Sequence, residues 1–139
     1  MIPSVEMAAP RILLVEDDDA VRRSLLLLLR SRGYDVRAYP SAVGLAMDPG
    51  ALSSVILVAD LMMPHTDAIE LLSELRGASW AGRSILISGH LDARWRARAI
   101  AAGYDAVLPK PISKSVLVRT VEELLPKPPV ESPEPEGSA

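Results

Sequence analysis

Short apolar runs alternate with segments of helical periodicity along most of this 139-residue chain, and this alternation is what most restricts its fold. A run without polar alternation is typical of a parallel strand buried on both faces, and residues 55–59 are the clearest example. Four more strands are expected, over residues 11–15, 34–39, 84–88 and 106–108. Five strands alternating with five helices predict an α/β domain with a parallel sheet, right-handed crossovers and three layers.

The expected helices begin at residues that cap helix N-termini and carry apolar side chains three or four positions apart. They span residues 20–32, 41–48, 67–76, 92–102 and 113–125, with Asp19, Ser41, Asp67 and Ser113 among the capping residues. The second is short and is expected to end at residues 48–50, where Pro and Gly follow Asp.

The helix over residues 92–102 combines small apolar residues with Trp95 and neighbouring arginines. Its expected buried face consists of Ala93, Ala97, Ile100 and Ala101, which leaves Trp95 pointing elsewhere. An exposed Trp beside Arg is typical of protein contacts. The alternative is that the ring folds over its own helix or fills a groove between helices.

Composition excludes several classes of protein. The chain has no Cys, so disulfides, thiolate catalysis and Cys-based zinc sites are ruled out. A net charge of −3 predicts neither a nucleic-acid nor a membrane surface. The apolar runs are far shorter than the roughly 20 residues that span a bilayer. No secretion signal is visible at the start, and we therefore expect a cytoplasmic protein.

Both ends of the chain differ from the middle. Residues 1–10 are expected to form a flexible leader, because Pro3 and Pro10 oppose regular structure. Residues 126–139 are rich in proline and glutamate and lack apolar periodicity, which predicts a disordered tail. The single folded domain is expected over residues 11–125.

Charged residues follow three of the expected strands. Glu16 and Asp17 come after the first, Asp60 follows the most apolar one, and Lys110 follows the last. The carboxyl ends of parallel strands share one edge of a sheet, where ligands bind. These side chains are therefore expected to converge, and such a group suits an aspartate that accepts a phosphoryl group beside a bound divalent cation.

Magnesium fits this chemistry because it prefers oxygen ligands and is commonly held by one or two carboxylates plus phosphate. Glu16, Asp17 and Asp60 supply such ligands and repel one another without a cation. An acidic cluster can also simply begin a helix, where carboxylates favour the positive end of the dipole. That alternative explains Asp18 and Asp19, but neither Asp60 nor Lys110.

The chain resembles a response-regulator receiver domain, the phosphoacceptor half of two-component signalling. The matching segments are ILLVEDDDAVR, VILVADLMMPHTDAIELL, ILISGH and AAGYDAVLPKP, in that order. The resemblance covers about residues 11–125 and implies a flavodoxin-like (βα)5 sheet with strand order 2-1-3-4-5.

The resemblance also implies roles for individual residues. Asp60 is then the phosphoacceptor, and Ser88 and Lys110 bind the phosphoryl oxygens. Mg2+ is held by Asp17 and Asp60, by Glu16 through water and by the backbone carbonyl of Met62. The bond from Lys110 to Pro111 is expected to be cis, which only an X-Pro bond makes inexpensive.

Several positions depart from the family pattern. Ser88 replaces the usual threonine and keeps its hydroxyl. Val107 replaces the aromatic switch residue, so a relay through a moving ring is in doubt. Met62 and His90 flank the expected path of hydrolytic water, where Met62 cannot orient a water molecule and His90 can.

The function expected is a stand-alone signalling switch, not a turnover enzyme, which catalyses only its own phosphorylation and dephosphorylation. Its expected partners are a histidine kinase or phosphotransfer protein and a downstream protein on the face of the last two helices and the fifth strand. No direct nucleic-acid or membrane contact is expected, and homodimerisation is compatible with this reading.

Three alternative functions fit parts of this pattern. An aspartyl-phosphate phosphatase needs Asp-x-Asp after the first strand, whereas Met62 stands two residues after Asp60. A flavin or nucleotide binder needs a glycine- or hydroxyl-rich first turn, and this turn is EDDD. A phosphorylation-independent receiver scaffold is opposed by the intact acidic residues, Ser88 and Lys110, although Val107 leaves it open.

Overall fold

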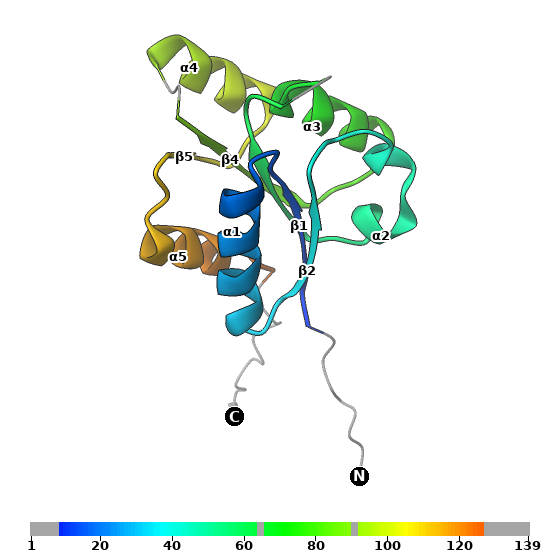
Figure 1. Ribbon diagram of the computed structural model, residues 1–139. Helices are drawn as coiled ribbons and strands as arrows, with labels where there is room; N and C mark the ends of the chain where they lie inside the picture. Colours follow the sequence, from blue (N-terminus) through cyan, green and yellow to red (C-terminus); the bar gives the residue numbers. More distant parts are fainter. Residues whose placement is uncertain (1–8, 64–65, 90–91, 127–139) are drawn as a thin grey trace, which may run out of the picture.

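The computed structural model of the chain describes residues 9–63, 66–89 and 92–126. Its five strands pair in parallel in the order β2-β1-β3-β4-β5 (Figure 1). This order confirms the flavodoxin-like, doubly wound (βα)5 fold that the resemblance implied. The strands are β1 (Arg11–Val15), β2 (Asp35–Tyr39), β3 (Ile56–Asp60), β4 (Arg83–Ser88) and β5 (Ala106–Pro109).

Helices cover both faces of the sheet and complete the three layers (Figure 1). One face packs against α1 and α5, and the other packs against α2, α3 and α4. The helices are α1 (Asp19–Ser31), α2 (Pro49–Leu52), α3 (Ala68–Gly77), α4 (Ala93–Ala102) and α5 (Lys114–Leu124), with a 3-10 turn η1 (Leu45–Met47) before α2.

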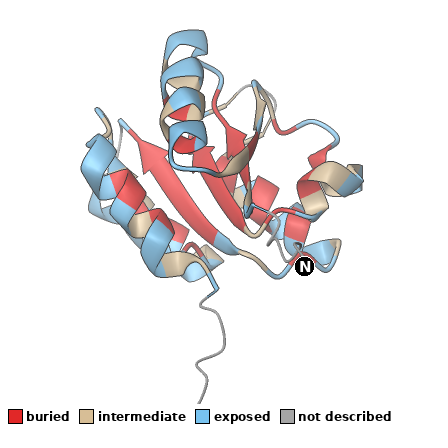
Figure 2. Ribbon diagram, turned by 90° about the horizontal axis from the view of Figure 1, so that it is seen from below, coloured by how far each residue is buried: buried red, intermediate tan, exposed pale blue. Residues whose placement is uncertain are grey.

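The sheet interior is the centre of the molecule, as the buried strands in Figure 2 show. Alternate residues of each strand face opposite layers. In β1, Ile12 and Leu14 face α1 and α5, whereas Leu13 and Val15 face the other layer. All five residues of β3 are buried, as expected for a central strand covered on both sides. Asp60, the last residue of β3, therefore belongs to a rigid central strand.

The starts of α3 and α5 follow the capping signals, but the start of α1 does not. Asp67 and Glu70 form a capping box at α3, and Ser113 caps α5 as predicted. The cap of α1 is Asp18 and not Asp19, because Asp18 Oδ1 accepts a hydrogen bond of 2.9 Å from the Val21 amide. Asp19 instead forms the first residue of the helix and an ion pair with Arg22.

The prediction of a helix over residues 41–48 is wrong. The chain forms η1 and then begins α2 at Pro49, at the point where the helix was expected to end. Asp48 caps α2 by accepting a hydrogen bond of 2.8 Å from the Gly50 amide. The Asp-Pro pair is a helix start as well as a helix stop, because proline suits the first helical position.

The buried face predicted for α4 is also wrong. Ala93, Ala97, Ile100 and Ala101 face solvent, and Ile100 is 57% exposed. Ala99 is buried and the half-buried Trp95 packs against the core, with the guanidinium of Arg98 4.4 Å from its ring centroid. Turning the helix this way covers the indole, the largest apolar group on α4. The ring is thus half-buried against the core and stacked on Arg98 of its own helix, so it is not an exposed contact residue.

The predicted leader and tail lie outside the described residues, except for residues 9, 10 and 126, and they stay predictions. Within the described ranges, no helix combines the length and hydrophobicity needed to cross a lipid bilayer.

Candidate functional site

The charged residues singled out from the sequence lie at the carboxyl edge of the sheet, defined here as the edge where the parallel strands end. Glu16 and Asp17 directly follow β1, and Asp60 is the last residue of β3. Ser88 is the last residue of β4, and Lys110 follows β5. Since β1, β3, β4 and β5 are consecutive neighbours in the sheet, all five residues are brought to one place.

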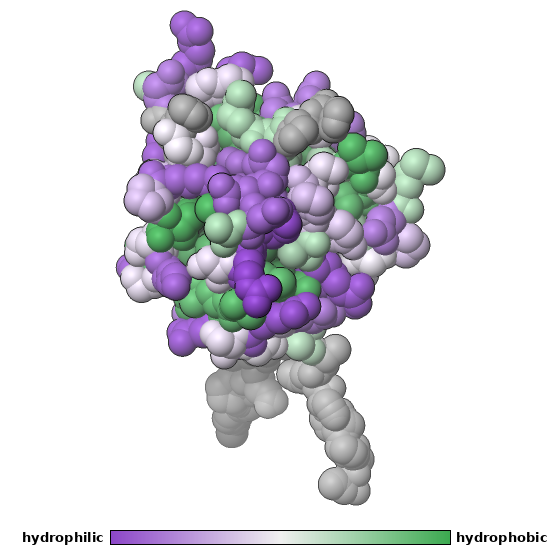
Figure 3. Space-filling model, viewed as in Figure 1, coloured by the Kyte–Doolittle hydropathy of each residue, from purple (hydrophilic) through white to green (hydrophobic). Residues whose placement is uncertain are grey.

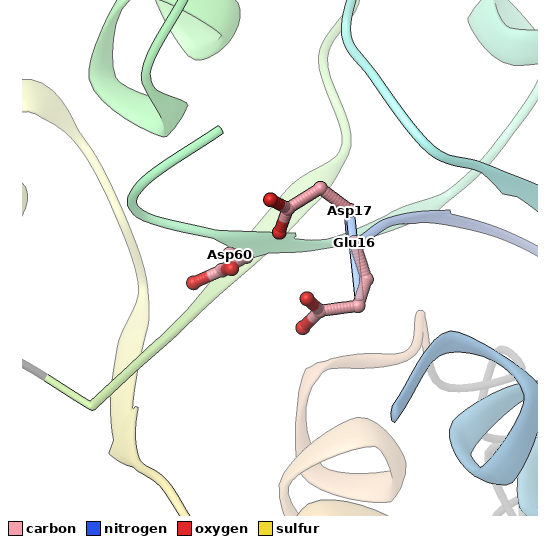
Figure 4. A group of neighbouring side chains, drawn as sticks. All are labelled: Glu16, Asp17 and Asp60. Atoms are coloured by element: carbon pink, nitrogen blue, oxygen red, sulfur yellow. The ribbon is translucent and has the colours of Figure 1, made fainter. Parts of the chain in front are cut away.

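Three carboxylates form the centre of this site. Glu16, Asp17 and Asp60 each offer a carboxylate oxygen within 4.8 Å of the others. Figure 4 shows the three side chains turned to the same side of the strand ends. Glu16 is 0% exposed and Asp60 6% exposed, whereas Asp17 faces solvent. Two carboxylates are therefore fixed in the protein interior, and the third closes the group from outside.

Lys110 balances this negative charge. Its Nζ lies 2.9 Å from Glu16 Oε1 and 3.3 Å from Asp60 Oδ2. The backbone holds the lysine in place, because the Lys110 amide donates a hydrogen bond of 2.9 Å to the Ser88 carbonyl. The following peptide bond to Pro111 is cis, as the resemblance implied. One ammonium thus faces two buried carboxylates.

The surroundings change the pKa values of both partners. Burial and the charge of Glu16 raise the pKa of Asp60 to about 6, although Lys110 acts in the opposite direction. Burial lowers the pKa of Lys110, but the carboxylates of Glu16 and Asp60 outweigh it and the net pKa is raised. Asp60 is therefore an anion whose charge the protein stabilises incompletely, while Lys110 stays an ammonium.

The donor set fits a divalent cation of the magnesium type. All three side chains offer carboxylate oxygens, which are the ligands that hard cations prefer. Glu16 Oε1 is buried and accepts no hydrogen bond, although it forms the ion pair with Lys110. Asp17 has no hydrogen-bond or ion-pair partner within the described part of the chain. Glu16 Oε1 thus has a cationic partner in Lys110, whereas the exposed carboxylate of Asp17 is available to a bound cation.

The remaining residues of the predicted site are less fully defined. Ser88 is 1% exposed and stands next to the site at the end of β4. Met62 is 52% exposed, two residues after Asp60, and the role of its carbonyl stays a prediction. Val107 is buried in β5 and packs in the same core cluster as Trp95. His90 lies outside the described residues.

One residue at the site was not anticipated from the sequence. Arg22, on the first turns of α1, donates a hydrogen bond of 2.9 Å from Nη1 to the Glu16 backbone carbonyl. Its Nη2 pairs with Asp19 Oδ1 at 2.6 Å. The spacing of Asp19 and Arg22, three residues apart on a helix, would have predicted the ion pair. No sequence signal indicates a hydrogen bond to a carbonyl outside the helix.

The fold and the site together define a class of protein: a flavodoxin-like α/β domain with an acidic cluster and a lysine at the carboxyl edge. Comparison with known proteins gives the family. A family model for the response regulator receiver domain matches residues 12–122. The chain belongs to this family.

Relatives and solved structures agree with this assignment. The transcriptional regulatory protein FixJ of Rhizobium meliloti (strain 1021) is 34% identical over 110 residues, which cover 78% of this chain and 53% of FixJ. The sensor kinase CckA of Brucella abortus (strain 2308) is 37% identical over 118 residues, covering 84% of this chain and 12% of CckA. The crystal structure of FixJ-N matches with a TM-score of 0.74 and 32% identity, covering 85% of this chain and 94% of that one.

These matches define a domain and not a whole regulator. The chain spans about half the length of FixJ and one eighth of CckA. Receiver domains are the signalling domains of two-component response regulators, are phosphorylated on Asp, generally bind Mg2+ through an acidic pocket, and interact with histidine kinases and phosphotransfer proteins. This chain has an acidic cluster of Glu16, Asp17 and Asp60 at the carboxyl edge of its sheet.

Proposed function

We propose that this protein is a phosphoacceptor switch that receives a phosphoryl group on Asp60 from a phosphohistidine of a kinase or phosphotransfer protein. The observation that carries the proposal is the surroundings of Asp60: it lies within 4.8 Å of two carboxylates and 3.3 Å from an ammonium. A buried carboxylate beside two other carboxylates and a lysine ammonium is suited to phosphoryl transfer, because that reaction depends mainly on positioning and charge stabilisation.

In the transfer, a carboxylate oxygen of Asp60 forms a bond to phosphorus while the bond from phosphorus to the donor imidazole nitrogen breaks. The attacking oxygen belongs to the ionised form of Asp60. Lys110, already 3.3 Å from Oδ2, can follow the new phosphoryl oxygens as a compact charge. The hydroxyl of Ser88, from the neighbouring strand β4, donates a hydrogen bond to another of these oxygens.

Asp17 and Asp60 would hold Mg2+ directly, Glu16 would act through a bound water, and the Met62 carbonyl would complete the protein ligands. When bound, the ion neutralises charge on the phosphoryl oxygens that would otherwise repel the carboxylate. The same site would support slow loss of the phosphoryl group to water. In this proposal the chain acts on itself and is not a turnover enzyme.

The proposed output is a change in a protein-contact surface formed by α4, β5 and α5. The receiver domain would act through such contacts without binding nucleic acid or membrane itself. The arginines and the solvent-facing apolar residues of α4 support this part of the proposal, because Arg beside apolar surface is common in protein interfaces.

Mass spectrometry of the intact protein tests the assignment. Wild type, Asp60→Asn and the control Glu74→Gln, which changes an exposed carboxylate on α3, are incubated with phosphoramidate and Mg2+. We expect wild type and the control to gain one phosphoryl group and Asp60→Asn to gain none, with EDTA abolishing the adduct. An adduct on Asp60→Asn would contradict the assignment. No adduct on any of the three would favour the phosphorylation-independent scaffold.

A further inference from the structure

The loop between β1 and α1 carries two of the three carboxylates, and one side chain fastens it. Arg22 reaches back from α1, so that Nη1 contacts the Glu16 carbonyl at 2.9 Å and Nη2 contacts Asp19 at 2.6 Å. The side chain of Arg22 is only 21% exposed. The guanidinium therefore connects the helix to the end of the strand through one hydrogen bond, and its second hydrogen bond, to Asp19 in the first turn of the same helix, orients the fork.

The hydrogen bond to the Glu16 carbonyl acts on the position of Asp17. The carbonyl of Glu16 and the amide of Asp17 belong to one planar peptide group. Fixing the oxygen of this group fixes the plane from which the Asp17 Cα and side chain project. Arg22 thus holds the peptide that carries a proposed metal ligand without touching the ligand carboxylate.

Within the described residues, the other hydrogen bonds of this loop lie on neighbouring peptide groups. The Glu16 amide is bound to the Tyr39 carbonyl at 3.0 Å, and the Asp18 amide to Glu16 Oε2 at 3.1 Å. Both contacts lie on peptide groups other than the one between Glu16 and Asp17. Asp17 itself lacks a side-chain partner within the described residues. Among these residues, Arg22 is the side chain that binds the peptide group preceding Asp17.

We propose that Arg22 is a positioning residue for the cation site: it orients the peptide group before Asp17 and thereby raises the affinity of the site for divalent cations. The inference rests on the proposed function in that it assumes a cation at Glu16, Asp17 and Asp60. Groups that orient metal ligands from outside the coordination sphere typically change metal affinity about 10- to 100-fold.

A purely electrostatic role of Arg22 predicts a change in cation affinity of the opposite sign. Arginine is a cation close to a site that binds cations, and on the face of the molecule shown in Figure 3 hydrophilic side chains alternate with apolar ones. If Arg22 acted only through its charge, removing it would relieve repulsion and tighten cation binding. If it positions Asp17, removing it weakens binding in spite of that gain. The direction of the change therefore separates the two roles.

The chain provides a matched control in the next residue. Arg23 is exposed, carries the same charge on the same helix turn, and forms no hydrogen bond or ion pair within the described residues. The test measures binding of Mn2+, used as a paramagnetic probe for the site, by electron paramagnetic resonance at constant ionic strength. The proteins are wild type, Arg22→Gln, Arg22→Lys and Arg23→Gln, with thermal unfolding recorded for each.

We expect Arg22→Gln to weaken Mn2+ binding about tenfold and Arg23→Gln to leave it unchanged or slightly tighter. Arg22→Lys keeps the charge but loses the fork, so its affinity should fall between wild type and Arg22→Gln. The Arg22→Lys variant keeps the test valid if Arg22→Gln unfolds. Equal or tighter binding by Arg22→Gln or Arg22→Lys, relative to wild type, overturns the proposal.

The experiment also separates this proposal from the proposed function. If wild type and the Arg22 variants bind Mn2+ equally well, Arg22 has no positioning role, and the phosphoacceptor assignment is unaffected. If wild type binds no divalent cation, the metal part of the proposed function and the role of Arg22 are both contradicted.

Discussion

At the scale of single residues, Asp60 is held in a position that costs folding free energy. It is 6% exposed, lies next to the buried Glu16, and is balanced by one lysine shared between two carboxylates. A carboxylate whose pKa is raised on folding destabilises the folded state wherever it is ionised. The site is therefore arranged for a further positive charge and not for the stability of the cation-free protein.

The first prediction concerns the charge of Asp60. Asp60→Asn removes a carboxylate whose pKa is raised to about 6 by burial and Glu16. We expect the variant to increase the free energy of unfolding by about 1–2 kcal/mol at pH 7 without Mg2+. Urea denaturation measures this difference.

The pH dependence of this effect has a defined sign. Because the pKa of Asp60 is raised on folding, the ionised group is unfavourable at pH 7, and the protein recovers this free energy as pH falls through about 6. The advantage of Asp60→Asn should therefore shrink between pH 7 and pH 4. A gain in stability that stays constant over this range would show that the Asp60 charge is not its cause.

The second prediction concerns Lys110, whose replacement is expected to lower the free energy of unfolding. Lys110→Gln leaves Glu16 and Asp60 without their shared ammonium, and Glu16 is 0% exposed. Removing one member of a buried ion pair leaves an uncompensated charge. We expect a loss of about 2 kcal/mol in the free energy of unfolding at pH 7, since Lys110 is partly exposed. Lys114→Gln, on the exposed start of α5, is the control and should change stability little.

At the scale of helices and strands, Tyr104 connects the start of α3 to the segment between α4 and β5. Its hydroxyl donates a hydrogen bond of 2.7 Å to the Ala68 carbonyl, and its ring belongs to the core cluster that contains Val107 and Trp95. Burial raises the pKa of Tyr104, so the hydroxyl stays a donor. The core beside β5 thus contains two aromatic side chains although Val107 is not aromatic.

The third prediction follows from this contact. Tyr104→Phe keeps the ring and removes the hydroxyl, which leaves the Ala68 carbonyl without that donor. We expect the free energy of unfolding to fall by about 1–2 kcal/mol. Chemical denaturation measures the change, and Tyr34→Phe, at a half-buried tyrosine, is the matched control. Equal stability of wild type and Tyr104→Phe would show that the hydrogen bond contributes nothing.

The sequence predicted helix starts better than helix faces. Asp67 and Ser113 cap their helices because capping depends on a side chain and an amide three residues apart, which is local information. The face of α4 depends on the space left by α3 and the sheet, which periodicity does not report. Ala93, Ala97 and Ile100 share a face as predicted, but Trp95 occupies the buried side.

At the scale of the whole molecule, the position of the site could be predicted because it follows from topology. Parallel strands bring their carboxyl ends to one edge, so Asp17, Asp60 and Lys110 meet although they are distant in the sequence. The contacts of Arg22 could not be predicted in this way. They depend on the angle at which α1 leaves β1, which the sequence does not state.

The fourth prediction concerns cation binding and global stability. A ligand that binds only the folded state adds about 2.7 kcal/mol when its concentration is one hundred times its Kd. MgCl2 at about one hundred times its Kd should therefore raise the Tm of wild type by several degrees relative to NaCl at equal ionic strength. Asp17→Asn should remove most of this shift, since Asp17 is the exposed member of the cluster. The same shift in Asp17→Asn and wild type would place the Mg2+ effect elsewhere.

The described chain begins and ends at the edge of the sheet opposite the acidic cluster. Ala9 and Pro10 lie beside Asp35 and Val55, and Pro126 lies beside Val55 and Gly82, where the strands start (Figure 1). An anchor attached at either point, whether a fluorophore, a bead or a biosensor chip, would keep the reactive edge facing the solution. Immobilised protein should consequently accept a phosphodonor as large as a folded kinase from solution without obstruction by its own attachment.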